Sequence, residues 1–170
     1  MVEKACCFTG HRPTRLPWGT DERDPRCLAL KRKIAERVEE AYLAGYRHFI
    51  CGMALGCDLY FAQAVLDLRE KYPDLILESA IPCPSQSHGW STADRARYEA
   101  ILDQCNLETV VQHHYDRGCM MRRNRYMVDH AQRIIAVYDG MGTGGTMRTL
   151  HYAMEKKLEI DMIGLDAFSF

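Results

Sequence analysis

Two kinds of hydrophobic pattern alternate along the chain. Between residues 26 and 44, apolar residues recur at spacings of four, four and three, and charged residues lie between them. The apolar residues are Leu30, Ile34, Val38 and Ala41. This period predicts a helix with one apolar face, and Gly45 follows it as a typical C-terminal glycine. Short uninterrupted apolar runs, such as residues 5–8, instead predict buried strands.

The whole pattern predicts six strands alternating with five helices. We expect the strands at residues 5–8, 48–51, 75–81, 107–112, 133–138 and 160–163. We expect the helices at residues 26–44, 58–72, 92–104, 119–130 and 146–157. Strands that alternate with helices through short connections are typical of a mainly parallel sheet with helices on both faces. The sequence therefore predicts an α/β, Rossmann-like, doubly wound fold, in one domain over residues 1–170.

The composition excludes several classes of protein. Apolar residues make up 47% of the chain and charged residues 26%, which is ordinary for a globular protein and excludes a disordered one. The 22 basic and 23 acidic residues give a net charge of −1, so no overall basic footprint for nucleic acid is present. No apolar stretch approaches the roughly 18 residues of a membrane span, and the start of the chain meets a turn too early for a signal peptide.

The eight cysteines include no C-x-x-C pair. We therefore expect reduced, mostly buried thiols in a cytoplasmic protein. A zinc site is the alternative, but Cys119 with His113 and His114 does not have the spacing of a standard ligand set. No metal is expected, and the sequence names no cofactor.

Candidate chemistry lies where strands end. In doubly wound folds, ligands bind outside the carboxyl ends of the strands, near the switch in strand order. Polar residues and glycines follow four of the predicted strands: Gly10, His11 and Arg12; Gly52, Gly56 and Asp58; Gln86; and the segment 139–146. We expect His11 to contact a ligand without acid–base work.

The segment 139–146 carries the strongest of these signals. Glycines let backbone N–H groups approach an anion, threonines add hydroxyl donors, and the helix that follows presents its positive end. These residues are Gly142, Thr143, Gly144, Gly145 and Thr146. They predict a phosphate or ribose site; the alternative is a flexible turn capped by Thr146. The turn from Gly52 to Asp58 is neither a Walker motif nor a G-x-G-x-x-G dinucleotide fingerprint.

Three arginines near the start of the fourth predicted helix offer a clamp for such an anion. Arg122, Arg123 and Arg125 span most of a helical turn and cannot all point the same way. We expect Arg123 to face the site and the other two to lie on the surface.

Taken together, these motifs resemble the YpsA-like family of bacterial proteins, within the SLOG superfamily of Rossmann-like domains. The matching features run in order along the chain: Gly10-His11-Arg12, the turn 52–58, Pro82 with Gln86 and Trp90, Arg123-Asn124 with Met127, and Asp139 with Gly144-Gly145-Thr146. SLOG domains are thought to handle nucleotide-type ligands, so the resemblance implies ligand binding by these residues, Asn124 and Asp139 included.

Two related families suggest different activities. The turn 52–58 and the Arg123-Asn124-Arg125 run are similar to those of the DNA-processing protein A (Smf) family, which binds single-stranded DNA. The segment 120–146 is similar to the Lonely-guy phosphoribohydrolases, but Thr146 stands where that family has its catalytic glutamate. Threonine supplies no carboxylate, so the resemblance to the phosphoribohydrolases implies the same class of ligand more strongly than the same reaction. Asp139 is the catalytic candidate only if the protein is an enzyme.

Four functions remain open from the sequence. The first is a sensor or carrier of a nucleotide or nucleotide-derived ligand. The others are a nucleotide hydrolase using Asp139, Asp58 or Glu78, a single-stranded nucleic-acid binder, and a structural protein. A homo-oligomer is a further option, since the apolar C-terminus, residues 165–170, either packs on a second copy or folds back on its own domain.

Overall fold

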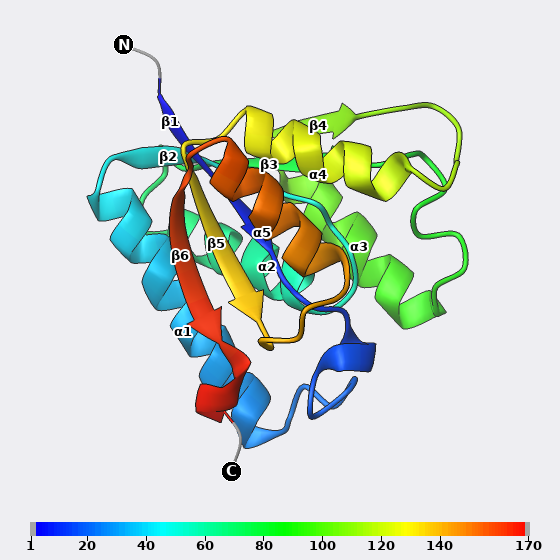
Figure 1. Cartoon of the computed structure of the whole chain (residues 1–170), viewed down its shortest axis with the longest axis horizontal. Helices are drawn as coiled ribbons and strands as arrows, with labels where there is room; N and C mark the ends of the chain where they lie inside the picture. The colour runs from blue at the N-terminus through cyan, green and yellow to red at the C-terminus, as the bar shows by residue number, and fades with distance from the viewer. Residues whose placement is uncertain (1–2, 169–170) are drawn as a thin grey trace.

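The computed structural model describes residues 3–168, in which six strands form one sheet (Figure 1). The strands are β1 (Lys4–Thr9), β2 (Tyr46–Cys51), β3 (Ile76–Ile81), β4 (Leu107–Val110), β5 (Arg133–Tyr138) and β6 (Glu159–Gly164). Their order across the sheet is β4-β3-β2-β1-β5-β6, and every neighbouring pair is parallel. The predicted α/β fold is confirmed, and the sheet is wholly rather than mainly parallel.

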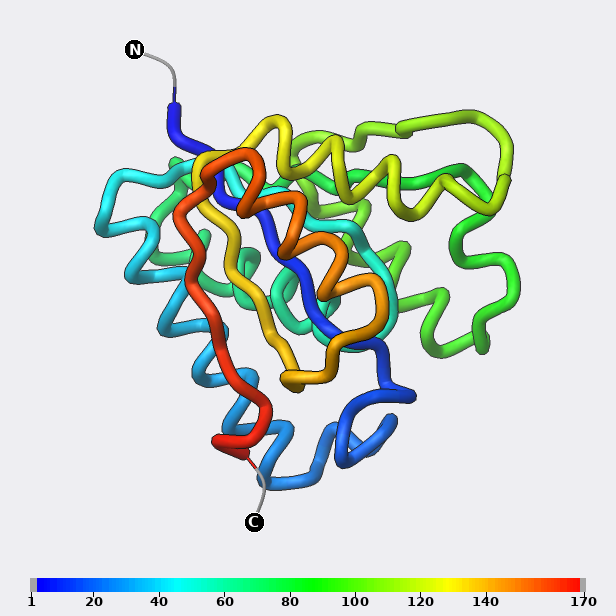
Figure 2. The backbone as a smooth tube through the Cα atoms, viewed as in Figure 1, coloured from blue at the N-terminus to red at the C-terminus, as the bar shows by residue number. Residues whose placement is uncertain are grey.

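Helices cover both faces of this sheet, as predicted. They are α1 (Pro25–Leu43), α2 (Cys57–Arg69), α3 (Thr92–Gln104), α4 (Cys119–Asp129) and α5 (Gly145–Glu155). α1, α2 and α3 lie on one face, and α4 and α5 lie on the other (Figure 1). The chain trace in Figure 2 runs from β1, in the middle of the sheet, to β6 at its edge.

Burial on both faces explains why the strands read as unbroken apolar runs. Along β1, Cys6 and Phe8 face the core under α1–α3, while Ala5 and Cys7 face the core under α4 and α5. The ring of Phe8 stacks on that of Phe61 from α2, with 4.6 Å between centroids. The apolar stripe predicted for the first helix is confirmed, because all four of its residues are buried.

The C-terminal segment folds back on the same chain. Leu165 and Phe168 lie in a short 3₁₀ helix, are buried, and belong to the same core as α1. This decides between the two alternatives for residues 165–168, while Ser169 and Phe170 lie outside the described residues. All eight cysteines are free and seven are buried, as expected. Over residues 3–168, no helix combines the length and apolar character that crossing a bilayer requires.

A buried carboxylate joins α4 to the sheet. Glu78 on β3 accepts hydrogen bonds from His48 Nε2 (2.7 Å), Thr109 Oγ1 (2.9 Å) and the Tyr126 hydroxyl (2.6 Å). Burial alone would raise the pKa of Glu78, but these donors outweigh it and lower the pKa to about 2. The carboxylate thus ties together β2, β3, β4 and α4.

This network makes stability depend on acid pH. The folded pKa of Glu78 lies below its unfolded value, so the stabilisation is present above pH 4.5 and is lost as the pH falls toward 2. We expect Glu78→Gln to lower the free energy of unfolding at pH 7 by about 1–3 kcal/mol. The difference from wild type should shrink between pH 5 and 3, as measured by urea unfolding.

The matched control is Glu99→Gln, which changes an exposed carboxylate on α3. It should leave the unfolding curve unchanged at every pH. A constant difference between wild type and Glu78→Gln over this pH range would contradict the assignment.

Candidate anion-binding site

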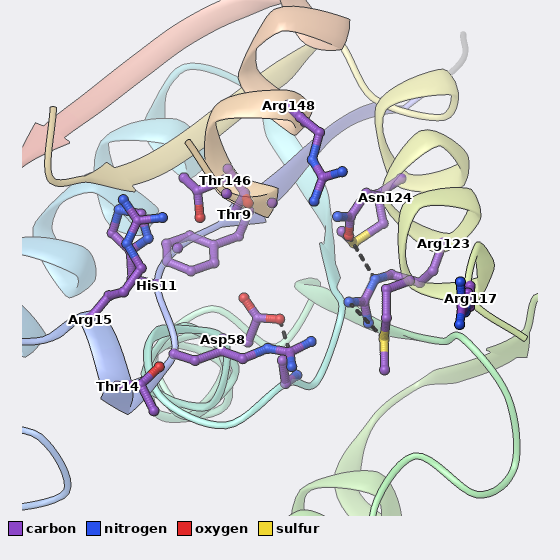
Figure 3. Close-up of a pocket in the computed structure, with 18 residues that line it drawn as sticks. Thr9, His11, Thr14, Arg15, Asp58, Arg117, Arg123, Asn124, Thr146 and Arg148 are labelled. Atoms are coloured by element: carbon purple, nitrogen blue, oxygen red, sulfur yellow. Dashed lines mark hydrogen bonds between the residues drawn. The ribbon is translucent and has the colours of Figure 1, made fainter. Parts of the chain in front are cut away.

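A cavity of about 440 Å³ opens at the carboxyl end of β1. β1 is central, with β2 on one side and β5 on the other, so the strand order switches direction at this point. The walls come from the segment after β1, the N-terminal ends of α2 and α5, and α4 with the loop before it (Figure 3). The cavity therefore lies where the sequence analysis placed the site.

The charge of this cavity is strongly positive. Five arginines line it, against a single carboxylate, Asp58. Arg15 is paired with Asp139, but the other four have no carboxylate within 4.0 Å among residues 3–168: Arg12, Arg117, Arg123, Arg148. Although the chain has a net charge of −1, positive charge is thus concentrated in this cavity, where it would attract an anion.

Arg123 on α4 is the buried member of this set, with 3% of its surface exposed. Its guanidinium donates to the carbonyl of Gly52 and, through Nε, to Asn124 Oδ1 at 2.8 Å. Burial lowers the pKa of Arg123, but an arginine keeps its proton in proteins. A buried positive charge with only neutral partners is costly until an anion approaches it.

The partner of Arg123, Gly52, has no room for a side chain. A Cβ at position 52 would lie 2.7 Å from Cζ of Arg123. The Gly52 carbonyl also accepts from Gln86 Nε2 at 2.9 Å, and Gln86 Oε1 accepts from the buried Tyr98 hydroxyl at 2.9 Å. Gly52, which the sequence predicts to approach a ligand, here lets the Arg123 guanidinium approach the backbone. Both the amide NH₂ and the amide oxygen of Gln86 form hydrogen bonds within the protein.

The N-terminus of α5 forms the opposite wall. Gly144 is its N-cap, and no side chain caps the helix, so its first N–H groups are open to an anion. Gly144, Gly145 and Thr146 all line the cavity, and Arg148 projects from the same helix (Figure 3). This part of the predicted phosphate turn is in place.

The loop before α5 is held by Arg15. Its guanidinium donates to both carboxylate oxygens of Asp139, at 2.7–3.0 Å, and to the Thr143 carbonyl at 2.7 Å. His11 Nε2 accepts from the Asp139 N–H at 3.1 Å. Burial lowers the pKa of His11, and this acceptor role requires its neutral form. Burial raises the pKa of Asp139, but the Met141 N–H and Arg15 outweigh it and lower that pKa.

Several predicted site residues serve the fold around the cavity. Gly10 borders the cavity, yet a Cβ there would lie 2.6 Å from that of Cys57, so its missing side chain admits α2 rather than a ligand. Gly56 is buried as the N-cap of α2, against the His11 carbonyl. Gly142 and Thr143 are exposed and lie outside the cavity lining. Of the five residues of the predicted turn, Gly144, Gly145 and Thr146 thus border the cavity and these two do not.

The remaining predicted residues divide between the cavity and its surroundings. His11, Arg12, Asp58, Arg123 and Asn124 line the cavity. Gln86 borders a second pocket of about 60 Å³ with Trp90 and Leu55, which shares Arg12, Ala54 and Met120 with the larger one. As predicted, Arg122 and Arg125 are exposed. The described residues contain no group of three or more His, Cys, Asp or Glu side chains that could hold a metal.

Sequence reasoning missed three arginines of the site. Arg15 lies in the short 3₁₀ helix Pro13–Arg15, Arg117 in the loop before α4, and Arg148 one turn into α5. The position of Arg148, two residues after Thr146, was a usable signal, because that turn of the helix borders any ligand at its N-terminus. Nothing local marks Arg15, whose partner Asp139 is 124 residues away.

A parallel α/β sheet that is covered by helices on both faces, with a basic cavity at its topological switch, defines a Rossmann-like protein. The particular family follows from comparison with known proteins: the chain belongs to the YspA SLOG family, whose model matches residues 6–168. It is 29% identical over 161 residues to the UPF0398 protein YpsA of Bacillus subtilis, covering 93% of this chain and 88% of that protein. A UPF0398 protein of Bacillus velezensis is 28% identical, with 93% and 87% covered.

A solved structure shares the fold. It is DNA processing protein A from Helicobacter pylori, described for its single-stranded DNA binding mode. The TM-score is 0.62 at 16% sequence identity, and the match covers 94% of this chain. This chain spans 65% of the length of that structure.

The Arg15–Asp139 pair should control the order of the loop before α5. We expect Arg15→Ala to speed hydrogen–deuterium exchange in residues 139–146, because the loop loses its only charged anchor among the described residues. Arg26→Ala is the matched control: Arg26 pairs with Asp24 at the start of α1, at nearly the same exposure. Unchanged exchange in Arg15→Ala would show that the backbone alone orders this loop.

Proposed function

We propose that the cavity binds a nucleotide or nucleotide-derived ligand through its phosphate, as a sensor or carrier. The observation that carries the proposal is the buried guanidinium of Arg123, which has no carboxylate within 4.0 Å among the described residues. A phosphate beside Arg123 would offset the cost of burying that charge.

The surroundings of Arg123 support a phosphate rather than a carboxylate ligand. The uncapped N-terminus of α5 and Arg148 line the same cavity as Arg123, so one ligand in it has backbone N–H groups and two guanidinium groups available (Figure 3). The volume of about 440 Å³ falls within the roughly 300–1,000 Å³ of small-molecule sites. A phosphate alone would leave much of it empty, which favours a larger nucleotide-type molecule.

Of the three carboxylates that the sequence offers for hydrolysis, Asp58 lines the cavity, and the other two are engaged elsewhere. Asp139 is paired with Arg15, and Glu78 is engaged by three donors under α4. Neither lines the cavity. Thr146, where related phosphoribohydrolases have a glutamate, supplies no carboxylate.

The proposal predicts that exposed arginines of the cavity decide affinity. We expect AMP at about 100 times its Kd to stabilise the wild-type protein by roughly 2.7 kcal/mol, measured by thermal unfolding. Arg148→Ala and Arg12→Ala should each weaken AMP binding by about 1.5–3 kcal/mol in calorimetry, the value of a charge-assisted hydrogen bond. Both side chains are exposed, so the unliganded protein should keep its Tm.

Arg32→Ala is the control, since it removes an exposed arginine from α1, on the other face of the sheet. It should leave AMP binding unchanged. ADP, NAD, ADP-ribose and inorganic phosphate complete the panel. Absence of binding by every member, or binding that survives in both Arg148→Ala and Arg12→Ala, would exclude this site.

Single-stranded DNA is a second candidate ligand. The fold shared with DNA processing protein A favours it, as do three exposed arginines that line the cavity: Arg12, Arg117, Arg148. The phosphates of a strand could bridge these arginines without entering the cavity deeply. The net charge of −1 and the confinement of these three arginines to one cavity favour the small ligand.

Fluorescence anisotropy with a labelled oligothymidylate separates the two candidates. If three arginines meet phosphates, log Kd should change with log salt at a slope of about 2 in magnitude. For a small-nucleotide protein we expect no oligonucleotide binding at physiological salt, and AMP-type ligands should displace any oligonucleotide that binds at lower salt. Tight oligonucleotide binding that AMP does not displace would favour the DNA function instead.

A further inference from the structure

The cavity contains one group that an anion site does not need. Asp58, the second residue of α2, is the only carboxylate in its lining and is 7% exposed. A phosphate would be repelled by it. Asp58 and Arg123 point toward the same space from α2 and α4 (Figure 3).

Only one of the two oxygens of this carboxylate has a structural hydrogen bond. Asp58 Oδ2 accepts the N–H of Ala54 at 3.1 Å, which fixes the turn before α2. Within residues 3–168, Oδ1 has no hydrogen-bond donor, and no arginine nitrogen lies within 4.0 Å of either oxygen. Burial raises the pKa of Asp58, with Arg123 and the Ala54 N–H acting in the opposite direction. In either protonation state, Oδ1 is able to accept a hydrogen bond.

Other strong acceptors in the cavity are already in use. His11 Nε2 accepts the Asp139 N–H, and Asn124 Oδ1 accepts from Arg123 Nε. Apart from threonine hydroxyls, which also act as donors, the Asp58 carboxyl is the side-chain acceptor in the lining left for a hydroxyl donor on the ligand. A nucleotide carries such donors on its ribose, close to its phosphate.

We propose that Asp58 accepts a hydrogen bond from a ribose hydroxyl, so that the cavity selects ribonucleotides over their deoxy analogues. The inference rests on the proposed function and adds a specificity-determining residue to it. It also separates the cavity from DNA, because an internal DNA nucleotide has neither a 2′-hydroxyl nor a free 3′-hydroxyl.

Calorimetry with AMP, 2′-deoxy-AMP and 3′-deoxy-AMP tests this on the wild-type protein. We expect at least one deoxy analogue to bind about tenfold or more weakly than AMP, the usual cost of losing a hydrogen bond to a charged group. If both deoxy analogues bind within threefold of AMP, the inference is wrong. Because this arm needs no variant, it stands even if position 58 tolerates no change.

Asp58→Asn provides the second arm. Its amide oxygen can keep the Ala54 N–H bond, while its NH₂ group replaces the carboxylate acceptor, so that any bond it donates to a ribose hydroxyl is a weaker, neutral one. We expect AMP and its deoxy analogues to bind this variant within threefold of one another. Asp67→Asn makes the same chemical change on the exposed side of α2 and should keep the wild-type preference. Selectivity retained in Asp58→Asn would assign the preference to another group.

The two proposals fail in different ways. If AMP binds, and Arg148→Ala weakens it, but the deoxy analogues bind equally well, only the role of Asp58 is lost. If no member of the panel binds, or if binding survives in both Arg148→Ala and Arg12→Ala, the proposed function is lost and the role of Asp58 with it.

Discussion

The contact between Arg123 and the carbonyl of Gly52 sets the shape of the site. It joins α4 to the end of β2 across the switch point, and it requires that position 52 carry no side chain. Gln86 and Tyr98 extend the contact to the segment after β3 and to α3. The hydrogen-bond acceptors that fix this guanidinium are neutral, and no carboxylate among the described residues lies within 4.0 Å, so its donors are not consumed by a direct ion pair. The same contact thus positions the wall of the cavity and gives it its chemistry.

A second set of contacts fixes the opposite wall. Arg15 binds both the carboxylate of Asp139 and the backbone at Thr143, while His11 receives the Asp139 N–H. These bonds hold the loop that leads into α5 and so aim the helix N-terminus at the cavity. Farther from the cavity, Glu78 secures α4 to three strands. Both helices that border the cavity are therefore positioned by charged side chains from distant parts of the chain. Such preorganisation lowers the cost of ordering the site when a ligand binds.

The distribution of charge in the cavity underlies the selectivity that we propose. Four arginines without a nearby carboxylate attract an anion, and one buried carboxyl stands among them. A uniformly basic surface would accept any polyanion. A basic cavity with one acceptor instead favours a small molecule that carries phosphate and hydroxyl groups together, as ribonucleotides do. Membership of the SLOG family and the fold shared with a DNA-binding protein are compatible with phosphate as the common element among ligands.

The hydrophobic period by itself determined the helices and strands. Burial of one face of a helix, or of both faces of a strand, requires apolar residues at a regular spacing in the sequence. α3 and β5 begin and end where that pattern predicts, and the others differ by a few residues at their ends. Strand-end glycines also located the site, since parallel strands end at one edge of the sheet. Only the tertiary structure decided which residues enter the cavity. It brought in Arg15, Arg117 and Arg148, left Gly142 and Thr143 at the surface, and assigned Gly10 and Gly52 to packing. These outcomes depend on contacts between residues far apart in the chain, which no local pattern records.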